Sequence, residues 1–284
     1  MPRSRFLLPV LFFLSTIVSS FGQQLYITNE PKKSLQLLNL STKALTTLYN
    51  IGAEPDDLIL NSAGQLLYTV PLPGTLNSYD PKSGVNTVLL SGIKYARDLF
   101  IEPGGQTMLI AIYTPGEILR YNFSTGTTTV LAKKLVTCDG IAYDAYGNLY
   151  AVANHNTIVQ INPVTGAILN TLVLEPHDGV NGGDGLTYDS YSQSLWATHF
   201  GTTGRGLIQI PTSSSGFTSA GFNLYLFPSE GSSIAPDGIK SDGKGNLYVG
   251  AINTAFVYNI PSGQISEIVV VGGADGVSLV PGTY

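Results

Sequence analysis

The chain has 284 residues, of which only 12% are charged, and 19 acidic against 14 basic residues give it a net charge of -5. This negative charge, with no Lys/Arg cluster, argues against nucleic acid or an anionic membrane surface as a partner. The 32 glycines indicate a fold of short strands and tight turns rather than of helices.

Residues 1–22 are expected to be a secretory signal peptide. Arg3 and Arg5 precede an apolar run from Phe6 to Val18, and the small residues around Gly22 suit cleavage after that position. The apolar run is too short to span a bilayer. Residues 23–284 are therefore expected to form one secreted, monomeric domain that has no membrane contact after cleavage.

Two further features fit a secreted chain. Cys138 is the only cysteine, so an internal disulfide is excluded and the side chain is expected to be a small buried hydrophobe. Asn39 and Asn122 begin Asn-x-Ser sequons and are expected to be glycosylated.

One pattern recurs six times along the remaining chain. In its clearest copy, Cys138 to Val152, two segments of alternating β-forming residues flank the turn Asp144-Ala145-Tyr146-Gly147-Asn148, as in a β-hairpin. The copies follow one another at intervals of 38 to 53 residues, close to the length of a four-stranded propeller blade. The second residues of the six copies are Asp56, Arg97, Asp139, Asp184, Asp237 and Asp275.

The two ends of the chain complete each other. Leu25 to Thr28 has the pattern of a second strand with no inner strand before it, whereas Asp275 to Val280 has the pattern of an inner strand with nothing after it. Pairing them would close a ring and remove its sheet edges. The sequence thus predicts an all-β, six-bladed β-propeller of four-stranded antiparallel blades, closed by the C-terminal strand pairing with the N-terminal blade.

Strand directions then place the start of every inner strand on one face, around the central channel. Five aspartates and Arg97 meet there, and like charges at close range raise pKa values or recruit a cation. Ca²⁺, which prefers oxygen ligands, could be held by the five carboxylates. Alternatively, each aspartate could cap its own strand by bonding to a nearby backbone N–H. The candidate metal ligands are Asp56, Asp139, Asp184, Asp237 and Asp275.

The loops between second and third strands should reach the same face and bring two histidines to equivalent positions. His155 and His199 are the predicted general bases, and His177, on a longer loop, is a predicted lid or substrate contact. Each could also be an ordinary surface or packed residue. The predicted substrate-binding residues are Arg97, Tyr113, Asn154, Phe200 and Asn253.

The repeated Asp-Gly-Ile/Leu…Gly-Asn-Leu-Tyr-Val pattern resembles the regucalcin/gluconolactonase family and related NHL-type six-bladed propellers, over essentially the whole chain after residue 22. The resemblance implies a channel metal, commonly Ca²⁺, held by a Glu, Asn and Asp, and lactone or ester hydrolysis. Pro236-Asp237-Gly238 matches the family's Pro-Asp-Gly ligand, while Asp184 stands where an Asn is expected and Asp56 where the Glu is expected.

Three function classes remain open at this point. The first is a secreted, metal-assisted lactonase or esterase acting on a small molecule. The second is a pericyclase, such as the hetero-Diels–Alder cyclases of fungal secondary-metabolite biosynthesis, which this chain resembles in fold and targeting. The third is a non-catalytic binding propeller, because fold does not fix function.

Overall fold

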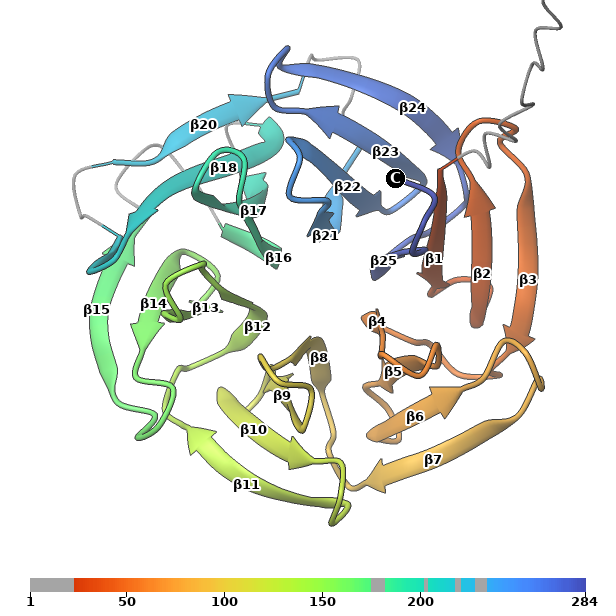
Figure 1. Cartoon of the computed structure of the whole chain (residues 1–284), viewed down its shortest axis with the longest axis horizontal. Coiled ribbons are helices and arrows are strands. Elements are labelled where there is room, and N and C mark those ends of the chain that lie inside the picture. Colours follow the sequence, from red (N-terminus) through yellow and green to blue (C-terminus); the bar gives the residue numbers. More distant parts are fainter. Residues whose placement is uncertain (1–22, 175–181, 202–203, 218–220, 228–233) are drawn as a thin grey trace, which may run out of the picture.

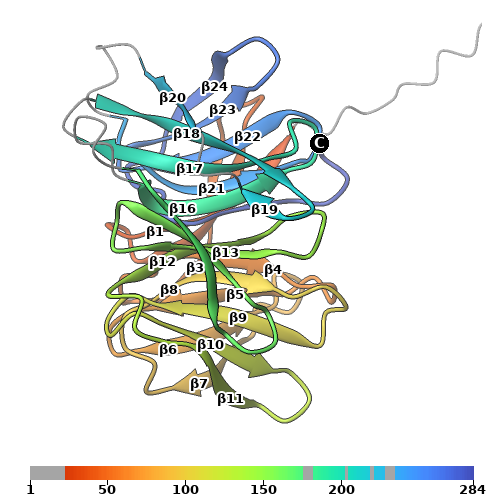
Figure 2. The ribbon, with the colours of Figure 1, turned by 90° about the vertical axis from the view of Figure 1, so that its left-hand side faces the viewer.

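The computed structural model describes residues 23–174, 182–201, 204–217, 221–227 and 234–284. The expected signal peptide and His177 lie outside these ranges. Within them, six antiparallel sheets surround a central axis and every regular element is a strand (Figure 1). Seen from the side, the strands run between the two faces of the molecule (Figure 2). The predicted all-β, six-bladed propeller is confirmed, and none of the described residues belongs to a helix that could cross a membrane.

Three blades come from the first half of the described chain, except that the inner strand of the first blade comes from the C-terminal end. From the inner strand outwards they are β25 (Val277–Leu279), β1 (Gln24–Asn29), β2 (Ser34–Asn39) and β3 (Leu45–Asn50); β4 (Leu58–Leu60), β5 (Leu66–Val70), β6 (Thr75–Tyr79) and β7 (Asn86–Ser91); and β8 (Ala96–Ile101), β9 (Thr107–Ile112), β10 (Glu117–Asn122) and β11 (Thr127–Ala132).

The other three blades follow in chain order. They are β12 (Cys138–Tyr143), β13 (Leu149–Ala153), β14 (Thr157–Ile161) and β15 (Ile168–Val173); β16 (Gly182–Asp189), β17 (Ser194–Gly201), β18 (Gly204–Ser213) and β20 (Asn223–Leu226), with β19 (Gly216–Phe217) also pairing with β18; and β21 (Pro236–Ser241), β22 (Asn246–Ala251), β23 (Thr254–Asn259) and β24 (Gln264–Val270).

The ring closes as the sequence predicts. β25 pairs antiparallel with β1, with Leu279 opposite Leu25 and Val277 opposite Ile27. Thr28 strengthens the junction, because its backbone N–H donates to the Gly276 carbonyl at 3.1 Å and its hydroxyl accepts from the Gly276 N–H at 2.7 Å. These contacts join residues almost 250 positions apart.

The hydrophobic core lies between adjacent blades. Each strand alternates its side chains between two faces, and in a propeller both faces of a blade meet a neighbour, so the middle strands are apolar on both sides. Ile110 and Leu109, for example, are both fully buried, and they belong to two different interblade clusters. Cys138 is a buried free thiol in one of these clusters, as expected.

Glycine in the Asp-Gly repeat allows neighbouring inner strands to approach each other closely. A Cβ atom added to any of four glycines would lie 2.0–2.7 Å from a backbone atom of the next inner strand, so no side chain fits there. These residues are Gly140, Gly185, Gly238 and Gly276. The second and third blades have Asp57 and Asp98 instead of glycine, and each places its carboxylate where it accepts a backbone N–H of the next inner strand.

The turns between third and fourth strands share an Asx motif. Asn39 Oδ1 accepts the Thr42 N–H at 2.9 Å, and Asn122 Oδ1 accepts the Ser124 N–H at 2.9 Å. Asp80, Asn162 and Asn259 do the same in other blades. Both sequon asparagines therefore have a structural role of their own, and their glycosylation stays a prediction.

Candidate functional site at the channel mouth

The six residues that begin the repeats meet around the channel, as predicted. They line one small cavity of about 20 Å³, together with Lys240 and, in several blades, the residue that directly follows them in the sequence. A cavity of that size holds one water molecule or one ion but no organic ligand. The channel can therefore hold a reacting group or a cation, while the body of any substrate must lie outside it.

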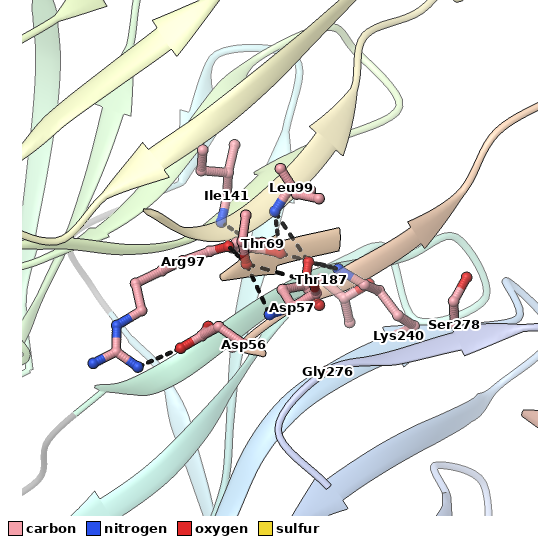
Figure 3. A network of polar contacts seen from close by, with 12 residues as sticks. Asp56, Asp57, Thr69, Arg97, Leu99, Ile141, Thr187, Lys240, Gly276 and Ser278 are labelled. Carbon is pink, nitrogen blue, oxygen red and sulfur yellow. Dashed lines mark hydrogen bonds and ion pairs between the residues drawn. The ribbon is translucent and has the colours of Figure 1, made fainter. Parts of the chain in front are cut away.

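Arg97 and Asp56 form an ion pair at this mouth, also seen in Figure 3. Burial raises the pKa of Asp56 to about 6 even though Arg97 lowers it, because nearby aspartates add repulsion. For Arg97, burial lowers the pKa, but the charges of Asp56, Asp184 and Asp139 outweigh it and raise the pKa overall. The guanidinium also lies over the Tyr113 ring, 5.3 Å from its centroid, so Arg97 is a fixed cation of the mouth.

Asp139, His155 and Asp184 form the group that could hold a metal ion. One donor atom from each lies within 4.8 Å of the other two. Asp139 is only 1% exposed, and among the described residues its Oδ2 has no hydrogen-bond partner. His155 Nδ1 lies 3.9 Å from that oxygen. A buried carboxylate oxygen without a donor is costly, and a bound cation would satisfy it.

Tyr113 fixes the orientation of His155. Its hydroxyl lies 2.9 Å from His155 Nε2, and the two rings pack with centroids 5.5 Å apart. His155 itself has φ 57° within a tight turn in which the Asn156 N–H donates to the Asn154 carbonyl. If Nε2 carries the proton and donates to Tyr113, Nδ1 presents its lone pair toward Asp139. This is how metal-binding histidines are usually oriented by a second partner.

The observed group differs from the predicted metal site. Of the five candidate ligands, only Asp139 and Asp184 join it, and Asp56 is engaged by Arg97. The set implied by the family resemblance, Asp56, Asp184 and Asp237, is not the cluster brought together in the described residues. An imidazole with two carboxylates suits Mn²⁺, Fe²⁺ or Zn²⁺ better than Ca²⁺, which prefers oxygen ligands.

Strand capping, the alternative role for the five aspartates, is also not observed. Within the described part of the chain, no hydrogen bond joins these carboxylates to a backbone N–H. Thr69 and Thr198 provide side-chain bonds to the inner strands instead: the Thr69 hydroxyl donates to the Arg97 carbonyl at 3.0 Å, and that of Thr198 accepts the Gly185 N–H at 3.1 Å. The carboxylates are thus left facing the channel.

A buried ion cluster below the mouth was missed by sequence reasoning. Lys240, from β21, lies 3.1 Å from Asp98. It also lies 3.6 Å from Asp57, and Figure 3 labels both of these residues. Asp57 accepts the Leu99 N–H at 3.0 Å, and Asp98 accepts the Ile141 N–H. The cluster links three inner strands across the channel. The sequence does contain a signal for this cluster. Two of the six repeats have aspartate where the other four have glycine, and one inner strand contains a lysine.

The other predicted catalytic histidine is placed differently from His155. His199 is fully buried inside β17, opposite Gly182 and Gly206, so the expected equivalence with His155 in a loop is wrong. β17 continues through His199 and Phe200 to Gly201, and all three residues pair with β18 instead of lying in a loop. To act as a general base, His199 would have to be accessible to water or substrate, and in the described structure its side chain is fully buried.

The predicted substrate-binding residues divide into two groups. Arg97, Tyr113 and Asn154 lie at or next to the Asp139 group. The Phe200 ring contacts Arg205, whose guanidinium lies 3.6 Å from the ring centroid. Asn253 receives the Val271 and Gly272 N–H groups at its carbonyl, which is a turn contact.

Comparisons with known proteins show the fold alone. The sequence matches no family model and no curated protein. A chain in a nidogen/laminin complex has a TM-score of 0.71 at 16% identity, over 90% of this chain and 97% of that one. Virginiamycin B lyase from Staphylococcus aureus has a TM-score of 0.61 at 17% identity, over 91% of this chain and 89% of that one. A streptogramin B lyase has a TM-score of 0.56 at 16% identity, over 87% of this chain and 74% of that one. The chain is a six-bladed propeller of this general kind, and its likeness to the regucalcin/gluconolactonase family stays a prediction.

Burial of the mouth aspartates, aided by their mutual repulsion, predicts a stability that falls as the pH rises. Burial, aided by Asp184, raises the pKa of Asp139 to about 8, and burial, aided by Asp56, raises that of Asp275 to about 8. Between pH 4 and 8 the folded protein then holds more protons than the unfolded chain, so unfolding becomes easier toward pH 8. At 1.36 kcal/mol per pKa unit, we expect a melting temperature at least about 5 °C lower at pH 8.5 than at pH 5.5, in chelator.

Calorimetry at the two pH values tests this expectation. The double variant Asp139→Asn with Asp275→Asn should have a flatter profile, because it removes both titrating groups while keeping their size. A wild-type melting temperature that rises over the same interval would contradict the raised pKa values of the mouth aspartates.

Proposed function

We propose that the protein is an enzyme that cleaves an ester or lactone bond in a small molecule at the channel mouth, with a divalent cation held by Asp139, Asp184 and His155. The observation that carries the proposal is the buried Asp139 Oδ2, which faces His155 and has no donor among the described residues. A cation at that point would also relieve the repulsion among the mouth aspartates.

The residues of the mouth have distinct roles in this proposal. A bound cation would supply Lewis-acid polarisation of the substrate carbonyl. Tyr113 keeps His155 Nδ1 directed at Asp139, which makes His155 a ligand instead of the general base expected from the sequence. Asp275 lines the same cavity, and burial raises its pKa above the ordinary value, which makes it the group proposed to exchange a proton with substrate.

Elimination is the second candidate for the bond-breaking step. Two of the similar structures are lyases by name, at an identity that supports the fold only. A polarised ester can lose a proton and expel its carboxylate, or it can be attacked by water, and the same mouth would serve both. The proposal also includes secretion of the protein, so its substrate would be an extracellular small molecule.

Cation binding is the first test. After chelation, Mn²⁺ and Zn²⁺ should bind in calorimetric titrations and raise the melting temperature more than Ca²⁺ does, because binding to the folded state stabilises it. Asp139→Asn should abolish the response, and Tyr113→Phe should weaken the affinity by about 10- to 100-fold. Asp80→Asn is the matched control, since other blades have asparagine at that turn position. Identical melting curves with chelator and with each cation would refute the site.

Turnover in H₂¹⁸O then distinguishes the reactions. Hydrolysis puts ¹⁸O into the acid product of an ester or lactone panel, whereas elimination gives an unlabelled acid and an alkene. A protein that binds the cation but turns over no member of the panel would not be the enzyme proposed here.

A further inference from the structure

A larger pocket lies beside the mouth and is lined by residues of the first, second and third blades. Its volume is about 400 Å³, within the range of roughly 300–1,000 Å³ typical of small-molecule sites. Loops preceding β2, β4, β6 and β8 contribute its walls. Asp56 and Arg97 line both this pocket and the channel cavity, so the two spaces adjoin at that ion pair.

One wall of the pocket is apolar and exposed. Leu72 is 57% exposed and Tyr95 is 42% exposed, beside Pro55 and Pro71. The Tyr95 backbone is fixed on both sides, because its N–H donates to the Pro71 carbonyl at 2.9 Å and its carbonyl accepts the Tyr113 N–H at 2.9 Å. An exposed leucine and an exposed aromatic side chain on a fixed backbone, inside a hollow of this size, suit the apolar body of a ligand.

One carboxylate of the pocket has no ion-pair partner among the described residues. Lys33 pairs with Glu54 at 3.4 Å, and Arg97 pairs with Asp56. Glu30 also lines the pocket, and no described residue forms an ion pair with it. The pocket therefore has a net negative charge beside a mouth rich in aspartate. Such a field attracts cations and repels anions.

We propose that this pocket binds a small organic amine, with its apolar body against Leu72 and Tyr95 and its ammonium group at Glu30. The ammonium could also lie over the Tyr95 ring, since aromatic faces attract cations. A ligand held in this way would extend toward Arg97 and the channel. This proposal goes beyond the catalytic one, because binding in the pocket requires neither the divalent cation nor bond cleavage.

Three ligands of similar shape and different charge test the pocket. In chelator and 150 mM salt, phenethylamine should bind at least tenfold more tightly than 2-phenylethanol, and 3-phenylpropionate should not bind, as measured by calorimetry or ligand-observed NMR. Glu30→Gln should lower the affinity for phenethylamine to that for 2-phenylethanol. Tyr95→Asn, which tolerates the left-handed backbone at this position, should weaken binding of both.

Glu117→Gln is the matched control. Glu117 begins β10 on the same face but does not line the pocket, so its loss should leave amine binding unchanged. Binding of the acid as tightly as the amine, or an equal effect of Glu30→Gln and Glu117→Gln, would overturn the proposal. Amine binding without turnover of any ester would support the pocket and refute the enzyme, and turnover without amine preference would do the reverse.

Discussion

Deletion of residues 275–284 is expected to unfold the protein. The deletion removes β25, the inner strand of the first blade, and exposes Leu25 and Ile27, which are fully buried in the closed ring. It also removes the contacts of Gly276 with Thr28 and with Asp57 of the neighbouring blade. Circular dichroism and calorimetry should show loss of the native β spectrum and of cooperative melting.

A shorter deletion provides the control. Removing only residues 282–284 leaves β25 in place and costs mainly the hydrogen bond from the Gln24 N–H to the Thr283 hydroxyl, so folding should persist. If the longer deletion also melts cooperatively with a native spectrum, β25 is not needed to close the ring.

Lys240→Met is expected to have the second largest effect. Lys240 is the cation shared by Asp57 and Asp98, both under 10% exposed, and its attraction to them raises its pKa although burial lowers it. Breaking a buried ion cluster by removing one partner typically costs about 3–5 kcal/mol, because the remaining charges have no compensation. Urea unfolding should therefore show a large decrease in the free energy of unfolding.

Two further variants isolate the cause. Lys244→Met removes an exposed lysine from a turn and should change stability by less than about 0.5 kcal/mol. Adding Asp57→Asn and Asp98→Asn to Lys240→Met removes the uncompensated charge while keeping oxygen acceptors for Leu99 and Ile141, so most of the stability should return. If this triple variant is no more stable than Lys240→Met alone, lost packing rather than charge explains the effect.

The fold could be predicted from the sequence because the signal is local and repeated. Each Asp-Gly start, hairpin turn and second strand lies within about 15 residues, and six copies confirm one another. Aligning the six repeats also predicted that Asp139, Asp184 and the corresponding residues of the other repeats surround the channel. The Lys240 cluster did not, because Lys240 and Asp98 are 142 residues apart and their contact depends on side-chain reach across the channel.

The histidines show the second limit of pattern analysis. Alternation predicts that β17 exists but not where it ends, and because the strand continues to Gly201, His199 lies in the core instead of in a loop. The role of His155 depends on its turn with φ 57° and on the Tyr113 hydroxyl, neither of which has a sequence signature. Ligand choice among five similar aspartates likewise required their positions in space.

The pairing of β1 with β25 also constrains how the chain folds during synthesis. β1 is translated early, but its inner partner follows some 250 residues later. At about 5–20 residues per second, the inner edge of β1 stays without its native partner for roughly 10–50 seconds. An unpaired strand edge with apolar residues on it can pair with other chains. The nascent protein is therefore expected to depend on a chaperone most strongly just before its last strand is made.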